Sequence, residues 1–247
     1  MSLLLLEPPV VPLAFPEFRP MTRHFLRALE DLSKDVLAMG GSVESTVGRA
    51  VRAFLERDVR AAQQVIEGDR DVNLHELRID EECLKMLALY QPTARDLRFI
   101  TATMKIINDL ERVGDLSVNI AERGLVLAEL PPRATPSAFV EMADRARAML
   151  TGSLDALVRH DATKAREVLK MDSAVDSLLK SIFDELELEM TQHGDRVRAD
   201  MQILSAAKNI ERIADHASNV AEDVVYLVEG EIVRHRKGPH GNAKRDE

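Results

Sequence analysis

The chain has 247 residues, 45% hydrophobic and 30% charged, so it can bury a core and is not expected to be disordered. Its formal net charge of -9 argues against nonspecific nucleic-acid binding, and no basic stripe offsets that charge locally. The single cysteine, Cys83, cannot close a disulfide within the chain, which is typical of a reducing cytoplasm. No apolar run approaches the roughly 20 residues of a membrane span, so we expect no membrane insertion.

Both ends of the chain differ in composition from its middle. Residues 1–20 combine a short apolar run, Leu3 to Leu6, with five prolines and lack a basic n-region, which argues against a signal peptide. We interpret them as an N-terminal extension. Residues 231–247 are predicted to form a flexible tail.

Between these ends, apolar residues recur with helical spacing and strand-like alternation is absent. A first helix is expected from about residue 20 to 56, and the pair Gly40–Gly41 could kink it. Asp58 is expected to cap a second helix that runs to about Tyr90. The break Gln91–Pro92–Thr93 then precedes a third helix that ends near Glu129.

The second half repeats this plan after a proline-rich linker at residues 131–136. Helices are expected over about 137–159, from the cap Asp161 to about 191, and from a break at 193–195 to about 229. Asp58 and Asp161 are 103 residues apart, whereas a later motif repeats after 100, which predicts a loop three residues shorter before the sixth helix. The predicted fold is all-α, with tandem three-helix bundles at 21–130 and 136–230 that arose by internal duplication.

That later motif is acidic and occurs twice. The first copy runs from Asn108 to Asp115 and the second from Lys208 to Asp215. At 100° per residue, the acids of each copy fall within about 40° on one helix face, with an asparagine roughly 40° further round. These residues are Glu111, Asp115, Glu122 and Asn119 in the first copy, and Glu211, Asp215, Glu222 and Asn219 in the second.

In each half, the helix before the acidic motif carries polar residues that could face it. In the first half, Asp69, Glu76 and Asp80 share a face with Asn73 nearby. In the second half only Asp172 and Asp176 occupy matching positions, because Leu179 and Phe183 replace the further acids. The two faces should therefore differ, with the first more acidic.

Carboxylates that converge from two helices form a hard-ligand site, suited to iron, manganese, magnesium, zinc or calcium rather than copper. The ordinary alternative is a solvated acidic surface. Arg112 and Arg212 could neutralise it, but they are expected to point about 100° away from Glu111 and Glu211. A ferritin-like or phosphatase-like metalloenzyme is the other alternative, although the Glu-x-x-His signature of di-iron bundles is missing. No nucleophile–base pair, phosphate-binding glycine loop or zinc spacing is present, so we expect no enzyme.

The chain resembles the PhoU family of phosphate-signalling proteins over about residues 21–232. The resemblance rests above all on the two acidic motifs, Leu110 to Asp115 and Ile210 to Asp215. It is supported by Met39–Gly41, Val65–Asp69 with Val72–Asn73, Ile79–Glu81 and Gln91–Arg98. It implies two three-helix bundles that bind metal clusters through their Glu/Asp-x-x-x-Asp motifs. The implied ligands are Glu111, Asp115, Glu211 and Asp215, with Asp69, Asp172 and Asp176 opposite.

The resemblance also implies a function. Family members act as negative regulators of the phosphate-starvation response between the ATPase of a phosphate ABC transporter and a membrane sensor histidine kinase. Many are dimers, so the expected protein is a cytoplasmic homodimer that associates peripherally with membrane partners. A further hypothesis places a partner-docking surface at Gln91–Ala94 with Asp96 and Arg98, against the simpler interpretation that Pro92 only starts a helix.

Overall fold

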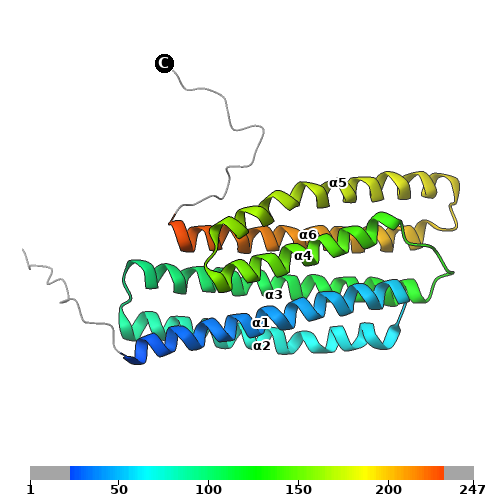
Figure 1. Cartoon of the computed structure of the whole chain (residues 1–247). Coiled ribbons are helices and arrows are strands. Elements are labelled where there is room, and N and C mark those ends of the chain that lie inside the picture. Colours follow the sequence, from blue (N-terminus) through cyan, green and yellow to red (C-terminus); the bar gives the residue numbers. More distant parts are fainter. Residues whose placement is uncertain (1–22, 231–247) are drawn as a thin grey trace, which may run out of the picture.

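The computed structural model describes residues 23–230 and confirms an all-α protein (Figure 1). Its six helices are α1 (Arg23–Glu56), α2 (Val59–Tyr90), α3 (Ala94–Ala128), α4 (Ser137–Arg159), α5 (Ala162–Gln192) and α6 (Val197–Glu229). These bounds lie within three residues of the expected ones. The extension at 1–20 and the tail at 231–247 lie outside the described residues.

The two predicted aspartate caps fix matching helix starts in the two halves. The Asp58 carboxylate accepts hydrogen bonds from the backbone N–H groups of Arg60 and Ala61 at 2.9 and 3.0 Å. The Asp161 carboxylate accepts from Lys164 N–H at 3.0 Å. Each bond satisfies a backbone donor that the first turn leaves unpaired, which contributes about 1 kcal/mol. α2 and α5 therefore begin at equivalent points of the duplication.

The two halves share one continuous core. In the first half α1, α2 and α3 pack together, in the second α4, α5 and α6, and the halves join where α3 lies against α6 and α1 against α4 (Figure 1). Gly40 permits the contact of α1 with α4, because a Cβ there would lie 2.7 Å from Leu154 Cδ2. α1 continues as α-helix through the glycine pair. Close helix packing accounts for this glycine.

The linker between the halves is held by two arginines. The Arg57 guanidinium, at the end of α1, donates to backbone carbonyls of Leu127, Leu130, Pro131 and Arg133. Arg133 then forms an ion pair with fully buried Asp200 of α6, with Nε–Oδ1 at 2.8 Å. These contacts satisfy carbonyls that the end of α3 leaves without helical partners. They also fix where the second half begins.

The expected difference in loop length is wrong. The break between α2 and α3 has three residues, 91–93, and the break between α5 and α6 has four, 193–196. The difference arises within the last helix of each half. α3 begins 17 residues before Glu111 (111 minus 94), whereas α6 begins 14 residues before Glu211 (211 minus 197). The helix before the acidic motif is therefore about one turn shorter in α6 than in α3.

Candidate functional site

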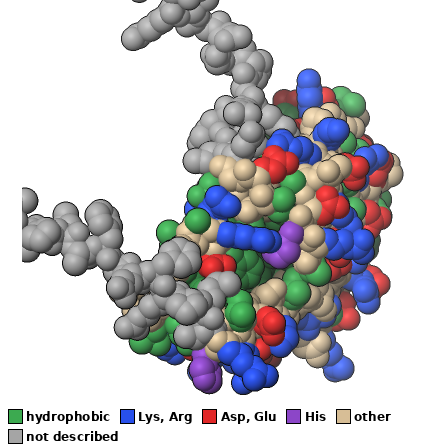
Figure 2. All heavy atoms as spheres, turned by 60° about the vertical axis from the view of Figure 1, so that its left-hand side comes forward, with side chains coloured by type: hydrophobic (Ala, Val, Ile, Leu, Met, Phe, Trp, Pro, Cys, Tyr) green, Lys and Arg blue, Asp and Glu red, His purple; other side chains and the backbone are tan. Residues whose placement is uncertain are grey.

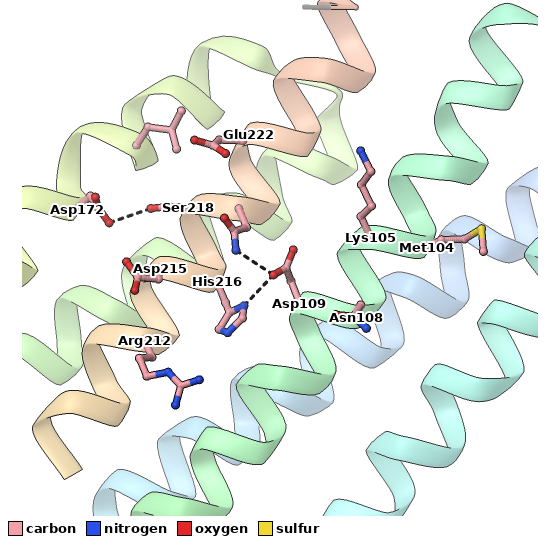
Figure 3. Close-up of a pocket in the computed structure, with 12 residues that line it drawn as sticks. Met104, Lys105, Asn108, Asp109, Asp172, Arg212, Asp215, His216, Ser218 and Glu222 are labelled. Carbon is pink, nitrogen blue, oxygen red and sulfur yellow. Dashed lines mark hydrogen bonds and ion pairs between the residues drawn. The ribbon is translucent and has the colours of Figure 1, made fainter. Parts of the chain in front are cut away.

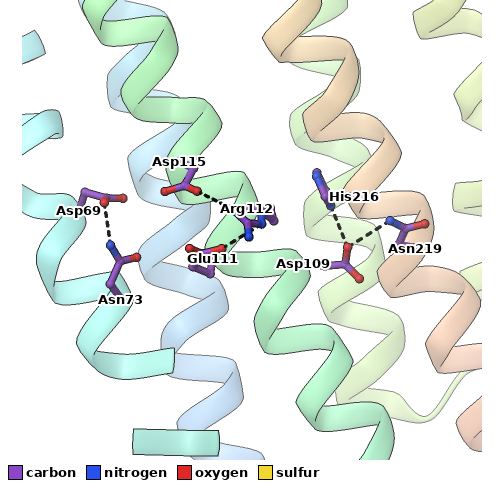
Figure 4. A network of polar contacts seen from close by, with 8 residues as sticks. All are labelled: Asp69, Asn73, Asp109, Glu111, Arg112, Asp115, His216 and Asn219. Atoms are coloured by element: carbon purple, nitrogen blue, oxygen red, sulfur yellow. Dashed lines mark hydrogen bonds and ion pairs between the residues drawn. The ribbon is translucent and has the colours of Figure 1, made fainter. Parts of the chain in front are cut away.

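The first acidic face forms where α2 packs against α3 (Figure 4). Asn73 Nδ2 donates to Asp69 Oδ2 at 2.9 Å, which orients both side chains. Asp69 reaches α3 beside Gly114, where a Cβ would lie 3.5 Å from Asp69 Oδ1. Gly114 therefore leaves room for the carboxylate between the helices. Asp69 and Asn73 on α2 thus face Glu111 and Asp115 on α3, as the helical spacing predicted.

This face is electrostatically unfavourable as it stands. Burial raises the pKa of Asp69, and the charge of Asp115 raises it further, against the hydrogen bond from Asn73. Burial also raises the pKa of Glu111, with additional contributions from Asp115, Glu76 and Asp69. Three buried acceptors make no hydrogen bond to the residues that the structure describes: Asp69 Oδ1, Asn73 Oδ1 and Glu111 Oε2. An unsatisfied buried acceptor costs about 1–3 kcal/mol, so an added donor or cation would stabilise this face.

Arg112 neutralises part of this face, contrary to the expectation that it points away. Its NH1 donates to Asp115 Oδ2 at 3.1 Å, and its Nε lies 3.4 Å from Glu111 Oε2 (Figure 4). The Cα–Cβ bond of Arg112 does point in a different direction from that of Glu111. The long Arg112 side chain bends back over its own helical turn to reach the acids. Because half of the Arg112 side chain is exposed, this pairing is weak.

The second acidic face lies between α5 and α6 and is more open. Asp172 and Glu211 are half-buried, whereas Asp176 and Asp215 are exposed. Burial is the main cause of the raised pKa of Glu211, and the charges of Asp215, Asp176 and Asp172 raise it further. Partial desolvation raises the pKa of Asp215, although its side chain is exposed overall, and the charges of Asp172 and Asp176 raise it further. Ser218 donates to Asp172 Oδ1 at 3.1 Å. The four carboxylates predicted here therefore interact with one another.

A cavity of about 940 Å³ opens beside this second face, between the two bundles (Figure 3). Asp172, Asp215 and Glu222 line one side, and Lys105 and Asp109 of α3 line the other. Across it, the Nδ1–H of His216 donates to Asp109 Oδ1 at 2.7 Å, and Asn219 Nδ2 donates to the same oxygen at 3.1 Å (Figures 3 and 4). Asp109 is 8% exposed, so this buried carboxylate joins α3 to α6.

Sequence periodicity missed this bridge. It assigned Asn219 to the second acidic face, but the Asn219 amide bonds Asp109 of the first bundle instead. It predicted no role for His216. A difference between the repeats was the available signal, since Asp109 corresponds at an offset of 100 to Asn209.

Other predicted residues interact with neighbours on their own helices. Glu122 pairs with its neighbour Arg123 at 3.2 Å, and Asn119 is half-buried on the same helix. Asp80 acts through its charge, which adds to burial in raising the pKa of Glu76. Within residues 23–230, no three His, Cys, Asp or Glu side chains are arranged closely enough to hold one metal ion.

Comparison with known proteins identifies the family. The model described as the PhoU domain matches residues 36–124 and 139–224, once in each half. The chain belongs to the PhoU family. The phosphate-specific transport system accessory protein PhoU homolog of Pseudomonas putida is 40% identical over 218 residues, covering 87% of this chain and 84% of that protein. The PhoU of Escherichia coli K12 is 33% identical, covering 87% and 89% of the two chains.

Solved PhoU structures share the fold. The crystal structure of PhoU from Pseudomonas aeruginosa superposes with a TM-score of 0.80 at 40% identity, covering 84% of this chain and all of that one. The phosphate transport system regulatory protein PhoU from Streptococcus pneumoniae gives 0.79 at 29% identity, covering 85% and 99%. The sequence resemblance and the predicted fold are thereby confirmed. Over residues 23–230, no helix is both long enough and apolar enough to cross a bilayer.

Proposed function

We propose that this protein is a non-catalytic regulator of phosphate uptake. The observation that carries the proposal is the 40% identity, over most of both chains, to an accessory protein of a phosphate-specific transport system. The site chemistry supports a binding role. The polar groups of the cavity between the bundles bond one another, as Asp109 does with His216 and Asn219 and as Ser218 does with Asp172.

In finer detail, the protein acts in the cytoplasm as a negative regulator of the phosphate-starvation response. It binds the ATPase subunit of a phosphate ABC transporter and a membrane sensor histidine kinase, as a homodimer. The net charge of -9 supports protein-mediated attachment, because anionic lipid repels such a surface. Disrupting the gene should therefore raise starvation-gene expression in phosphate-replete cells. Unchanged expression would contradict negative regulation, and failure to co-purify with the ATPase would contradict the transporter contact.

Metal binding is the second part of the proposal. The donor set fits a hard cation, because carboxylate and amide oxygens of the first face include three buried acceptors without a hydrogen bond. Asp69, Asn73, Glu111 and Asp115 would hold the ion there, and Asp172, Asp176, Glu211 and Asp215 would hold one at the second face. Because no three acidic side chains of residues 23–230 already meet closely enough for one ion, binding requires the carboxylates of each face to move together. A bound cation would supply the charge that these carboxylates lack and would relieve their mutual repulsion.

Two matched double variants test the metal faces. Glu111→Ala with Asp115→Ala removes the α3 half of the first face, and Glu211→Ala with Asp215→Ala does the same to the second. Because each face has its own carboxylates, each variant should bind about half of the wild-type manganese or iron, and their combination almost none. Metal content after equilibrium dialysis and helicity by circular dichroism provide the readouts. Wild-type stoichiometry in both variants, with the helices intact, would show that the faces are only solvated.

A further inference from the structure

α2 carries a row of exposed leucines, the leucine stripe, on the side of the helix that faces away from the core. The exposed fractions of Leu74, Leu77 and Leu84 are 47%, 57% and 51%. At 100° per residue these three lie within about 80° of one another and nearly opposite the buried Ile79. Among the described helices α2 packs only against α1 and α3, so the stripe lies at an outer edge of the molecule (Figure 1).

The equivalent helix of the second half has no such stripe. At the offset of 103 residues that relates the two aspartate caps, the leucines correspond to Ser177, Lys180 and Glu187 of α5, which are all exposed. On the face shown in Figure 2, at the end where α1 begins, apolar side chains are interspersed with charged ones. Because the duplicated helix is polar at these positions, the fold itself does not require leucine there. An apolar row that the fold leaves exposed indicates a contact with another molecule.

We propose that the leucine stripe is the contact between two copies of this chain, which pack α2 against α2 in antiparallel orientation. The inference rests on the homodimer of the proposed function and names the surface that forms it. The stripe follows positions 70, 74, 77, 81, 84 and 88, which alternate by four and three residues. That spacing is typical of helices that pair side by side along their length. Two-fold symmetry requires such a surface to be complementary to itself.

Side-chain type and charge select the register of this pairing. With the two-fold axis between residues 75 and 76, each residue lies opposite the one whose number is 151 minus its own. Leu74 then lies opposite Leu77 of the second copy, and symmetry brings four leucines together at the axis. Arg70 lies opposite Glu81 of the second copy, so an ion pair forms on each side of these leucines.

The remaining charges of α2 agree with this register. Asp71 lies beside Arg78 of the second copy, which again forms two pairs of opposite sign. Within residues 23–230 the one ion pair of α2 joins Lys85 to Glu82, so the charges used in the proposed contact are available. The axis also falls within about one residue of the middle of α2 (Val59–Tyr90). Residues 61–90 of the two copies therefore overlap, over about 45 Å of helix.

Transplanting α5 side chains onto α2 tests the leucine contact. Leu74→Ser with Leu77→Lys gives α2 the residues that α5 carries at these positions. The matched control, Val158→Ser with Leu188→Lys, changes two exposed apolar side chains of the second half. Sedimentation velocity over a range of protein concentrations gives the dimer dissociation constant, and circular dichroism gives the helicity. The control should dimerise like the wild type, and the α2 variant at least about a hundredfold more weakly with unchanged helicity.

Charge reversal tests the register. Arg70→Glu places two acids opposite each other in both symmetric pairs, and Glu81→Arg does the same with two bases. Each variant alone should dimerise about tenfold more weakly than the wild type. An equimolar mixture should recover most of the affinity, because a heterodimer of the two variants regains both ion pairs.

The outcomes separate this inference from the homodimer itself. Wild-type affinity in the Leu74→Ser, Leu77→Lys variant would overturn the inference and assign the homodimer to another surface. A wild-type protein that stays monomeric at every concentration would overturn both. Charge variants that are weakened alone and remain equally weak when mixed would refute the antiparallel register.

Discussion

Replacement of Asp109 tests whether the contact between the bundles is a stabilising bridge. Asp109 is the acceptor for both His216 and Asn219, and both bonds end on its Oδ1. Asp109→Ala removes the acceptor and leaves two donors of α6 facing the cavity. The matched control is Asn209→Ala, at the equivalent position of the other repeat, where no such bridge forms among the described residues.

The expected cost follows from the bond geometry. Hydrogen bonds to a charged acceptor contribute about 1.5–3 kcal/mol each. Two such bonds would give about 3–6 kcal/mol, but the 940 Å³ cavity admits water, which can satisfy the abandoned donors. We therefore expect a loss of about 2–3 kcal/mol in the free energy of unfolding. For a domain of this size that corresponds to a fall of about 5–10 °C in Tm.

Urea unfolding followed by circular dichroism measures this loss. A double-mutant cycle with His216→Ala isolates the Asp109–His216 term, which should be about 1–2 kcal/mol. Asn209→Ala should change the free energy of unfolding by less than about 0.5 kcal/mol. A coupling energy near zero, or equal losses for Asp109→Ala and Asn209→Ala, would refute the bridge.

Three further outcomes are expected. Arg112→Gln should tighten manganese binding at the first face about two- to fivefold, because it frees Glu111 and Asp115; a titration that shows weaker binding would contradict this competition. Cys83 should react slowly with Ellman's reagent at pH 8 in the native protein and fast in denaturant, since burial raises the pKa of its thiol to about 12. The free energy of unfolding should also fall as the pH rises above about 9, where only the unfolded thiol ionises, and Cys83→Ala should remove that dependence. Gly124→Val should cost about 1–3 kcal/mol in urea unfolding, because a Cβ there would lie 3.1 Å from the Phe54 Cα, whereas Gly41→Ala, with nothing within 4 Å, should be neutral or stabilising.

Helix positions and faces could be predicted from the sequence because their causes are local. Asp58 and Asp161 mark helix starts through bonds to backbone groups two or three residues away. Helical periodicity placed Asp69 opposite Glu111 because α2 and α3 are adjacent and antiparallel. Both inferences need only spacing along one chain segment.

The missed features depend on information that spacing does not carry. Periodicity gives the direction of a Cβ but not where a long side chain ends, so it placed Arg112 away from the acids that its guanidinium reaches. The Asp109 bridge depends on how α3 lies against α6, a contact between residues 107 and 110 positions apart. That packing follows from the shared core, which no single repeat determines.

Duplication has placed one motif in two different environments. At the first face the carboxylates are half-buried and include acceptors without hydrogen bonds, so a cation there mainly relieves a local electrostatic cost. At the second face, Asp215 directly precedes His216, whose ring bonds the first bundle. Any change that moves the α6 turn carrying Asp215 must therefore also move the donor to Asp109. The first face is linked in the same way, because Asp109 precedes Glu111 by two residues on α3. The contact between the bundles therefore joins a helical turn of each face, so ligand binding at either face is placed to alter how the two halves sit together.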